Sequence, residues 1–562
     1  MGRNRILAVT VCLAVGISAC GGDDDADSNA SDTTDVADST SSDVTATDVT
    51  ATDVTGTDAT ATGSGDCTGD PVDGGSLTYA RQLETQTLDP LNIRNGNGDI
   101  FADGIIYQGL VRYDPMGGTD IVPGAAESWE VSDDGMTYTF ALRPDLKFSN
   151  GDPVTAQDVK FSLDLFGNPE TNPVMSVLTT GYESSEIVDE STFQVNLSTP
   201  VPAFLDNIST FPASILPEAL VTEQGDEFWN NPVGTGPFMF DEFVSGSKVS
   251  FVRNPNYWEA GLPHLDAVTF NFALDGNSRL LSLTSGDVQI ADGIAPSQIE
   301  GVTSNDGLIL ENFPTPASIM IFPNLQRPEL ADQNVRLAMM SALDRNAINE
   351  QIFASLGTVP NSVMQALKYD ASDEAIPPIP FDLEQAKEYM AASAFPDGFS
   401  TTLEYPSGTD YFNQLALLVQ QQLAVIGIDV ELLRQDPTTL VTNWVEEQHD
   451  LNFVFPGTSS DVAVPDEYAL FFGDPEGNNA FHTSFDDPAI TTLVKEFVSN
   501  PDEAAREQQW PVIQQAFMDQ QPIFNLLNIP FLNAYSTSVC GRDVNVLGVD
   551  QLQNTWLAGD AG

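Results

Sequence analysis

Residues 21–66 form a low-complexity segment that limits where this chain can fold. The segment contains no Lys, no Arg and no aromatic residue, and a pentad repeats in it as DVTAT, DVTAT, DVTGT and DATAT between Asp43 and Thr62. Such a composition cannot bury enough apolar surface to offset the entropy of ordering the chain. We therefore expect a flexible tether with a mean reach of roughly 40 Å and a stretched reach of roughly 150 Å. An O-glycosylated stalk is the alternative.

The residues before this tether have the pattern of a bacterial lipoprotein signal peptide. Two arginines precede an apolar run from Ile6 to Ala19, which is too short to span a membrane and suits an export signal. The small residues ahead of Cys20 resemble a lipobox, in which the cysteine is acylated. We expect residues 1–19 to be the signal peptide and residues 20–66 to be the lipidated cysteine with its tether, anchored to a bacterial membrane by lipid alone. An ordinary signal peptide with an incidental cysteine is the alternative.

The rest of the chain is long and acidic. Its roughly 500 residues are too many for one hydrophobic core and predict two or three packed domains. The chain carries 20 Lys and Arg against 82 Asp and Glu, a formal net charge of −62. Nucleic acid is not expected as a partner, because phosphate binding needs basic patches. The acidity favours either attraction of cationic ligands or a solvated surface suited to salty surroundings, where screening weakens long-range steering.

Two cysteines remain once Cys12 leaves with the leader and Cys20 takes the lipid. They are Cys67 and Cys540, near opposite ends of the folded part. Cysteines outside the cytoplasm tend to pair. We therefore expect a disulfide between them, although sequence spacing alone does not show that the two are close.

The stretch from Glu127 to Phe166 predicts a strand followed by a helix. Residues 136–142 alternate large apolar side chains with small ones, which is the period of a half-buried strand. Thr155 and Asp158 then form a capping-box pattern. The residues that follow on one helical face are Val159, Leu163 and Phe166.

The second half of the chain alternates helix and strand. Residues 415–426 predict an amphipathic helix, Gly427 suits its C-terminal stop, and residues 428–432 alternate as a strand. Helix, glycine and strand in this order indicate an α/β unit with a sheet. An earlier helix is marked by apolar residues at i, i+3, i+4 and i+7, which are Val335, Ala338, Met339 and Ala342.

A series of motifs runs through the chain in a fixed order. They are TLDPLN (87–92), GLVRYD (109–114), the block 127–166, NPVGTGPFMF (231–240), VRNPNYWEAGLPHLDAVTF (252–270), LTSGDVQIADGI (283–294), NVRLAMMSALDRNAI (334–348) and the helix and strand of 416–432. Together they resemble the extracytoplasmic solute-binding proteins of peptide and nickel ABC transporters, family 5, of the dipeptide/oligopeptide-binding type. The resemblance covers nearly all of residues 66–562.

This resemblance implies an α/β fold of the two-lobed periplasmic-binding-protein type (venus flytrap, class II or cluster C), with an extra subdomain inserted in the first lobe. Strands that cross between the lobes are expected near Leu308 to Phe322 and near Pro522 to Pro530. Cys67 and Cys540 would then both lie in lobe I, which supports their pairing. The expected division is residues 67–95, 226–312 and 525–562 for lobe I, 96–225 for the inserted subdomain, and 313–524 for lobe II.

The resemblance also implies a ligand-binding loop in lobe II. Peptide-binding members carry there an Asp that pairs with the ligand's α-amino group, and Asp461 with Pro465 fits the family's Asp-x-x-x-Pro spacing. A carboxylate in a closing cleft is a sound partner for a cation. The chain departs from the family pattern at Thr458, where a Trp is common, and at Val464, where a second acid is common.

Four aromatic residues are predicted as apolar or stacking walls for the ligand: Tyr405, Tyr411, Trp444 and Tyr468. Core packing is the alternative for each. The motif GTGPF is interpreted as a structural turn, in which Gly234 and Gly236 permit backbone angles closed to other residues. No Lys follows it, unlike in a phosphate-binding loop.

Metal binding by the protein itself is not expected. Its three histidines, His264, His449 and His482, are far apart in sequence, and none has the spacing of a metal-ligand pair. A chelated metal complex does not need histidine and stays open as a ligand. No cofactor is implied.

The sequence therefore predicts a monomeric binding module, not an enzyme, that captures a peptide or related small solute and delivers it to an ABC permease. A surface-anchored hydrolase is the alternative, but the chain has no Gly-x-Ser-x-Gly motif and few histidines. A receptor for a peptide signal would have the same fold. The ligand itself is left open among peptides, nickel chelates, haem, sugars and opine-like derivatives.

Overall fold

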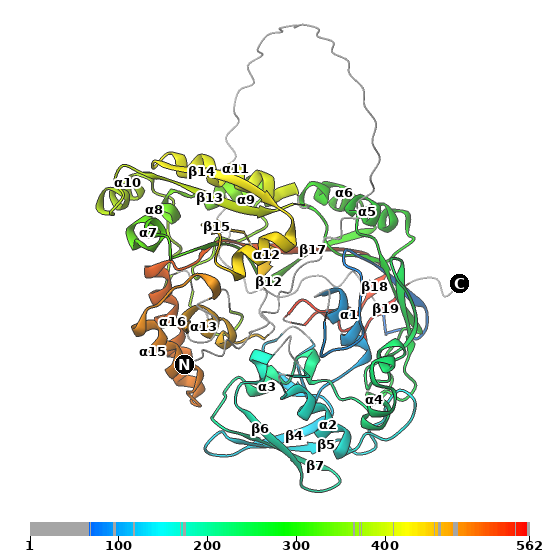
Figure 1. Cartoon of the computed structure of the whole chain (residues 1–562). Coiled ribbons are helices and arrows are strands. Elements are labelled where there is room, and N and C mark those ends of the chain that lie inside the picture. The colour runs from blue at the N-terminus through cyan, green and yellow to red at the C-terminus, as the bar shows by residue number, and fades with distance from the viewer. Residues whose placement is uncertain are drawn as a thin grey trace.

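A computed structural model gives the fold of most of the chain after the tether (Figure 1). Among the residues that it describes, no helix is both long enough and apolar enough to cross a membrane. The leader, Cys20 and the tether lie outside these residues. The described residues are 67, 69–93, 97–115, 118–168, 170–171, 176–363, 366–369, 371–372, 374–407, 410–453, 456–458, 462–475, 481–545 and 547–558.

One large sheet runs through the molecule. Its strands follow the order β14-β13-β15-β12-β17-β11-β1-β10-β9-β8, and β16 (Pro456–Thr458) pairs with β12 beside this path. The two long strands in the middle, β12 (Leu308–Pro323) and β17 (Phe524–Ser536), are antiparallel to each other. They join the half of the sheet on one side to the half on the other (Figure 1). These are the crossing strands that the sequence predicts, with β17 reaching further than expected.

Lobe I is built on the strands at one end of this path. In β1, Leu77 and Tyr79 pack with helix α1 (Asn97–Ile106), whereas Ala80 faces the opposite cluster around α5 (Gly276–Ser285). Alternate residues of a strand point to opposite faces, so one strand supplies both cores. The strands are β1 (Ser76–Arg81), β8 (Phe238–Val244), β9 (Lys248–Arg253), β10 (Ala267–Phe272) and β11 (Ile290–Ala291). Two short elements, α4 (Glu218–Gln224) and η3 (Gly225–Asn230), precede β8.

The glycines of GTGPF lie against the end of α1. A Cβ on Gly234 would stand 2.2 Å from the carbonyl oxygen of Ile106, and one on Gly236 would stand 2.6 Å from that of Ile105. Neither glycine has a positive φ. The expectation of special backbone angles is therefore wrong, because these positions need glycine for the close approach of two backbones.

The inserted subdomain has its own sheet, in the order β4-β5-β7-β6 (Figure 1). Strand β5 (Thr137–Leu142) buries alternate residues, and α2 (Ala156–Phe166) begins with the capping box of Thr155 and Asp158, so both predictions for this stretch are confirmed. The other elements are β2 (Val111–Tyr113), β3 (Ile121–Pro123), β4 (Ala126–Val131), β6 (Tyr182–Ile187), β7 (Thr192–Leu197) and α3 (Phe204–Asn207).

Lobe II holds the other end of the large sheet. The parallel strands β13 (Phe399–Pro406), β14 (Ile428–Gln435) and β15 (Leu451–Asn452) are packed against helices. The predicted helix–glycine–strand unit is confirmed as α11 (Asp410–Ala424), Gly427 with φ of 87°, and β14. The four apolar residues expected on one helical face are all buried in α8 (Gln333–Ala342). A second cluster contains α12 (Pro437–Val445), α13 (Asp466–Gly473), α15 (Pro488–Val498) and α16 (Glu503–Gln520).

The two ends of the folded region meet in lobe I. Cys67 and Cys540 form a disulfide with a Cα–Cα distance of 5.9 Å. Cys540 lies in β18 (Val539–Cys540), which pairs with β19 (Trp556–Leu557). Val539 packs in the same cluster as β1, so the bridge links the start of the fold to the core of lobe I.

Candidate functional site

Lobe II contacts the inserted subdomain through residues 462–464. Val462 and Val464 are buried in the core cluster of the subdomain, together with residues such as Val111, Tyr138 and Phe204. This segment follows β16 in sequence and immediately precedes the first turn of α13. The subdomain and lobe II therefore share a hydrophobic contact at the place where the sequence predicts the ligand-binding loop.

Ala463, between these two valines, is held by hydrogen bonds from both sides. Its backbone N–H donates to the hydroxyl oxygen of Tyr113 at 2.7 Å. Its carbonyl oxygen accepts from the backbone N–H groups of Leu367 and Lys368, each at 3.1 Å. Tyr113 belongs to β2, in the inserted subdomain. Its hydroxyl therefore holds residues 462–464 of lobe II across the contact.

The same hydroxyl donates to Oδ1 of Asp206 at 2.8 Å. Burial raises the pKa of Asp206 to about 6, while the hydrogen bond from Tyr113 and the charge of Lys368 act in the opposite direction. Two further charges, Asp466 and Arg506, act on it more weakly and with opposite signs. Burial also raises the pKa of Tyr113 well above its usual range, so the phenol stays protonated and remains a donor.

A buried ion pair anchors the chain just after the contact. Arg506 donates from Nη1 to Oδ1 of Asp466 at 3.0 Å and from Nη2 to Oδ2 at 2.5 Å. The guanidinium also lies over the ring of Phe497, 4.2 Å from its centroid. A second pair joins Lys368 to Glu503 at 2.8 Å. Charge-assisted, bidentate contacts of this kind hold a side chain in one geometry, so α13 starts from a fixed point.

Asp461, the predicted partner of the ligand's amino group, lies outside the described residues. Its neighbour Val462 is 1 % exposed at the contact with the subdomain. In sequence, Asp461 directly precedes a residue at the junction of lobe II with the subdomain. Its role as a ligand contact stays a prediction.

The four predicted wall residues are placed in the two cores of lobe II. Trp444 and Tyr468 share one cluster, where Trp444 packs against Phe481 with ring centroids 4.8 Å apart. Tyr405 and Tyr411 belong to the other cluster, where Tyr411 stacks on Phe412. Packing, the alternative that the sequence leaves open, is what these side chains show, and a ligand contact stays a prediction for each.

The three histidines differ in their surroundings. His449 and His482 are buried, and burial lowers the pKa of each to about 4. His264 makes a hydrogen bond through Nδ1 to Asp73 at 2.8 Å. Within the described part of the chain, no group of three or more His, Cys, Asp or Glu side chains is placed to hold a metal ion.

Sequence reasoning missed Tyr113, Asp206 and Lys368. Tyr113 stands in the quoted motif GLVRYD, but no periodicity indicates that its hydroxyl reaches a backbone N–H group some 350 positions further along. Asp206 is an acid in a short helix of an acidic chain, so composition does not single it out. Only the packing of the subdomain on lobe II brings these groups together.

The profile described as bacterial extracellular solute-binding proteins, family 5 Middle, matches residues 120–480. The chain belongs to this family of extracytoplasmic substrate-binding proteins of ABC importers. It is similar to the glutathione-binding protein GsiB of Pectobacterium atrosepticum, with 31 % identity over 355 residues, which cover 62 % of this chain and 67 % of the relative. The GsiB of Escherichia coli O1:K1 / APEC is 28 % identical over 467 residues, covering 81 % of this chain and 89 % of the relative.

Solved structures have the same two-lobed fold. The binding protein AgaA of A.tumefacien R10, in complex with agropinic acid, matches with a TM-score of 0.74 and 26 % identity, over 86 % of this chain and 99 % of that one. The binding protein DppA of Helicobacter pylori, in complex with the peptide STSA, has a TM-score of 0.75 and 23 % identity, over 87 % of this chain and 99 % of that one. The fold class that the sequence implies is confirmed, and binding of a solute for transport follows from the family.

Proposed function

We propose that this protein captures a peptide or an amino-acid derivative between its two lobes, outside the membrane, and delivers it to an ABC permease for import. The observation that carries the proposal is the contact of residues 462–464 with the inserted subdomain. A ligand held beside this contact touches both lobes. Such a ligand favours the closed form, because its contacts with both lobes exist only there.

The two crossing strands are the place where we propose that one lobe moves relative to the other. The lobes are joined through β12 and β17, whose pairing register shifts between Pro314 and Ser318 and again between Ile319 and Met320. Irregular pairing at these points leaves fewer regular ladder hydrogen bonds to oppose bending. We assign the hinge to this part of β12 and to the start of β17. We keep the division into lobe I, inserted subdomain and lobe II given above, except that α1 packs in the core of lobe I.

The class of ligand in this proposal is inferred from Asp461. A carboxylate at this position would pair with the α-amino group of a peptide or of an amino-acid derivative, and a charge-assisted hydrogen bond of this kind is strong when water is excluded. The ligands of similar proteins support this class, since they include glutathione, the peptide STSA and agropinic acid. The departures at Thr458 and Val464 predict a ligand contact set different from that of peptide-binding members.

The membrane anchor is a further part of the proposal. A lipid on Cys20 would keep the protein at the membrane, and the tether of residues 21–66 would let it turn to capture ligand and to reach its permease. Replacing Cys20 with Ala should release the protein from the membrane fraction. Retention of the Cys20→Ala variant at the membrane would contradict lipid anchoring.

The test of ligand capture is thermal unfolding of the soluble chain from residue 66 onward, measured against separate pools of glutathione, short peptides, sugars, chelated metals and haem. A ligand at a hundred times its dissociation constant should add about 2.7 kcal/mol to the free energy of unfolding. We expect this shift with the glutathione or peptide pool. No shift with any pool, or a shift with sugars alone, would contradict the proposed ligand class.

Two variants connect the shift to the predicted contact. Asp461→Ala should remove most of the ligand-induced stabilisation, because the ammonium group then loses its counter-charge. Asp397→Ala is the matched control, since Asp397 is an exposed acid in lobe II far along the chain from the junction. Equal ligand responses of the two variants would show that Asp461 does not bind the amino group.

A further inference from the structure

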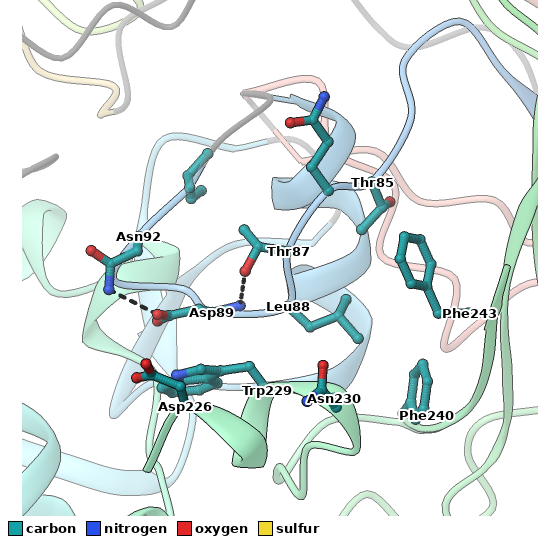
Figure 2. A pocket seen from close by; sticks show the side chains of 12 residues that line it. Thr85, Thr87, Leu88, Asp89, Asn92, Asp226, Trp229, Asn230, Phe240 and Phe243 are labelled. Carbon is teal, nitrogen blue, oxygen red and sulfur yellow. Dashed lines mark hydrogen bonds between the residues drawn. The ribbon is translucent and has the colours of Figure 1, made fainter. Parts of the chain in front are cut away.

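A pocket of about 790 Å³ lies on lobe I, between residues 85–93, η3 and β8 (Figure 2). This volume is in the range of small-molecule sites. Every described residue that lines it belongs to these three segments of lobe I, and none of them comes from lobe II. A molecule bound there would therefore not bridge the lobes and would not by itself favour the closed form.

One wall of the pocket, residues 85–93, is held in place by hydrogen bonds to other elements. The carboxylate of Asp99, on α1, accepts from the backbone N–H groups of Gln86 at 2.5 Å and Thr87 at 3.2 Å. The hydroxyl of Tyr107 donates to the carbonyl oxygen of Leu88 at 2.9 Å. Next to the wall, Glu84 accepts from the N–H group of Gly246 in the β8–β9 turn at 2.6 Å. The wall is thus formed before any ligand arrives.

Three aromatic rings also line the pocket. Trp229 comes from η3, and Phe240 and Phe243 come from β8 (Figure 2). Trp229 packs edge-on against the fully buried Phe228, with ring centroids 4.9 Å apart. This contact holds the indole ring of Trp229 in place. Phe243 is 39 % exposed and packs edge-on against Phe272 of β10, with ring centroids 6.3 Å apart.

The charged side chains that line the pocket are both acidic. Asp89, 6 % exposed, accepts hydrogen bonds from the backbone N–H of Leu91 and from the side chain of Asn92. Asp226 is exposed and its carboxylate lies beside the ring of Trp229 (Figure 2). Among the residues that the structure describes, the lining contains no Lys, Arg or His. The pocket therefore repels anions and attracts cations, and the chain's net charge of −62 adds to this field.

We propose that this pocket is a second binding site, which takes a small organic cation with an apolar ammonium head. Ring faces attract such a head through cation–π contact, which Trp provides best. Asp226 supplies the counter-charge at the rim, and the neutral amides and hydroxyls of the lining bind the polar end of the molecule. The site is separate from the one at the junction of the lobes and does not depend on it.

The test compares choline with its uncharged isostere 3,3-dimethylbutan-1-ol, by calorimetric titration of the soluble chain from residue 66 onward. Choline should bind at least tenfold more tightly, because cation–π contact and the carboxylates act on the charge alone. Trp229→Leu should weaken choline binding about tenfold or more. Equal affinities for the two probes, or binding of neither at tens of millimolar, would overturn the proposal.

Three further variants keep the result independent of folding defects and of the transport site. Asp226→Asn, a nearly isosteric change at an exposed position, should weaken choline binding severalfold. Asp306→Asn, the same change at an exposed acid elsewhere on lobe I, should leave it unchanged. Asp461→Ala should also leave it unchanged. Choline binding that responds to Asp461→Ala but not to Asp226→Asn or Trp229→Leu would place the cation at the junction and overturn the second site.

Discussion

A single phenol hydroxyl, that of Tyr113, serves two groups at the contact between the lobes. It accepts from the N–H of Ala463 and donates to Asp206. Tyr113→Phe leaves a buried N–H without its acceptor, which should lower the free energy of unfolding by about 1–3 kcal/mol in chemical denaturation. Ligand release should be faster, because the closed form loses a contact that the open form lacks.

The control for this variant is Tyr138→Phe in the same subdomain. The hydroxyl of Tyr138 donates to the carbonyl oxygen of Val201 at 3.4 Å, and that oxygen also accepts from the N–H of Phe204 at 2.9 Å. Removing the Tyr138 hydroxyl therefore strands no buried group. Equal losses in the two variants would show that Tyr113 contributes no more than an ordinary buried phenol.

Asp206 predicts a dependence of stability on pH. Its pKa in the folded protein is about 6, above the unfolded value of 3.8, so the folded state binds an extra proton between these values. Its contribution to the free energy of unfolding is therefore fully present below pH 3.8 and is lost as pH rises through 6, by about 3 kcal/mol at most. Asp206→Asn should remove this component.

The comparison must be made between the wild type and Asp206→Asn in the same buffers. His449 and His482 have folded pKa values of about 4, below their usual 6.5, so they destabilise the protein as pH falls between these values. Their slope opposes that of Asp206 and is present in both proteins. Parallel stability curves from pH 4 to pH 7 would show that Asp206 does not titrate as the structure indicates.

At the scale of elements, the capping box of α2 (Ala156–Phe166) also holds the start of α4 (Glu218–Gln224). Asp158 accepts from the N–H of Thr155 at 2.9 Å through Oδ2, and from the N–H of Glu218, at the start of α4, at 3.0 Å through Oδ1. Thr155→Ala should lower the free energy of unfolding by about 0.5–2 kcal/mol, the usual cost of a lost N-cap.

Asp158→Ala should cost more than Thr155→Ala in chemical denaturation, because it also frees the first N–H of α4. Thr155→Ser, which keeps the hydroxyl that accepts from the N–H of Asp158, is the control and should stay close to the wild type. A smaller loss for Asp158→Ala than for Thr155→Ala would show that the link to α4 contributes nothing.

The elements that sequence could predict are those whose signal is local. In α2, α8 and the α11–Gly427–β14 unit, the residues that set the period or the cap are near neighbours in the chain, and the structure has them in the expected roles. For Gly234 and Gly236 the predicted reason is wrong, since the atoms that require glycine there belong to Ile105 and Ile106. A contact between distant segments leaves no local pattern.

The same distinction applies to the candidate site. The place of the ligand-binding loop could be predicted from the Asp-x-x-x-Pro spacing and the family resemblance, but the groups that hold the loop could not. Tyr113, Asp206 and Lys368 come from three separate segments, and the hydrogen bonds that join two of them to Ala463 depend on how lobe II packs on the subdomain. Sequence alone ranks these residues no higher than their neighbours.

At the scale of the whole molecule, lobe I and lobe II have separate hydrophobic cores that β12 and β17 connect. Buried charges reinforce this connection on the side of lobe I. Arg542 pairs with Glu311, on β12, and with Asp550, at 2.6 Å between Nε and Oδ1. Removing one member of such a buried set leaves an uncompensated charge. Because each lobe has its own core, the lobes should unfold as two units. The crossing strands and these buried charges should keep the two units coupled.

The disulfide offers a way to see these two units. Cys67 and Cys540 both belong to lobe I and are 473 positions apart, so their bond restricts the unfolded chain over nearly the whole folded region. The double variant Cys67→Ser, Cys540→Ser should lower the stability of the lobe I transition by about 2–5 kcal/mol in scanning calorimetry. The lobe II transition should move much less, because its core contains neither cysteine, and reduced wild-type protein should match the variant.

A ligand that bridges the lobes should bring the two transitions together, because it binds only when both are folded. Equal shifts of both transitions without ligand would show that the lobes unfold as one unit and would contradict this description.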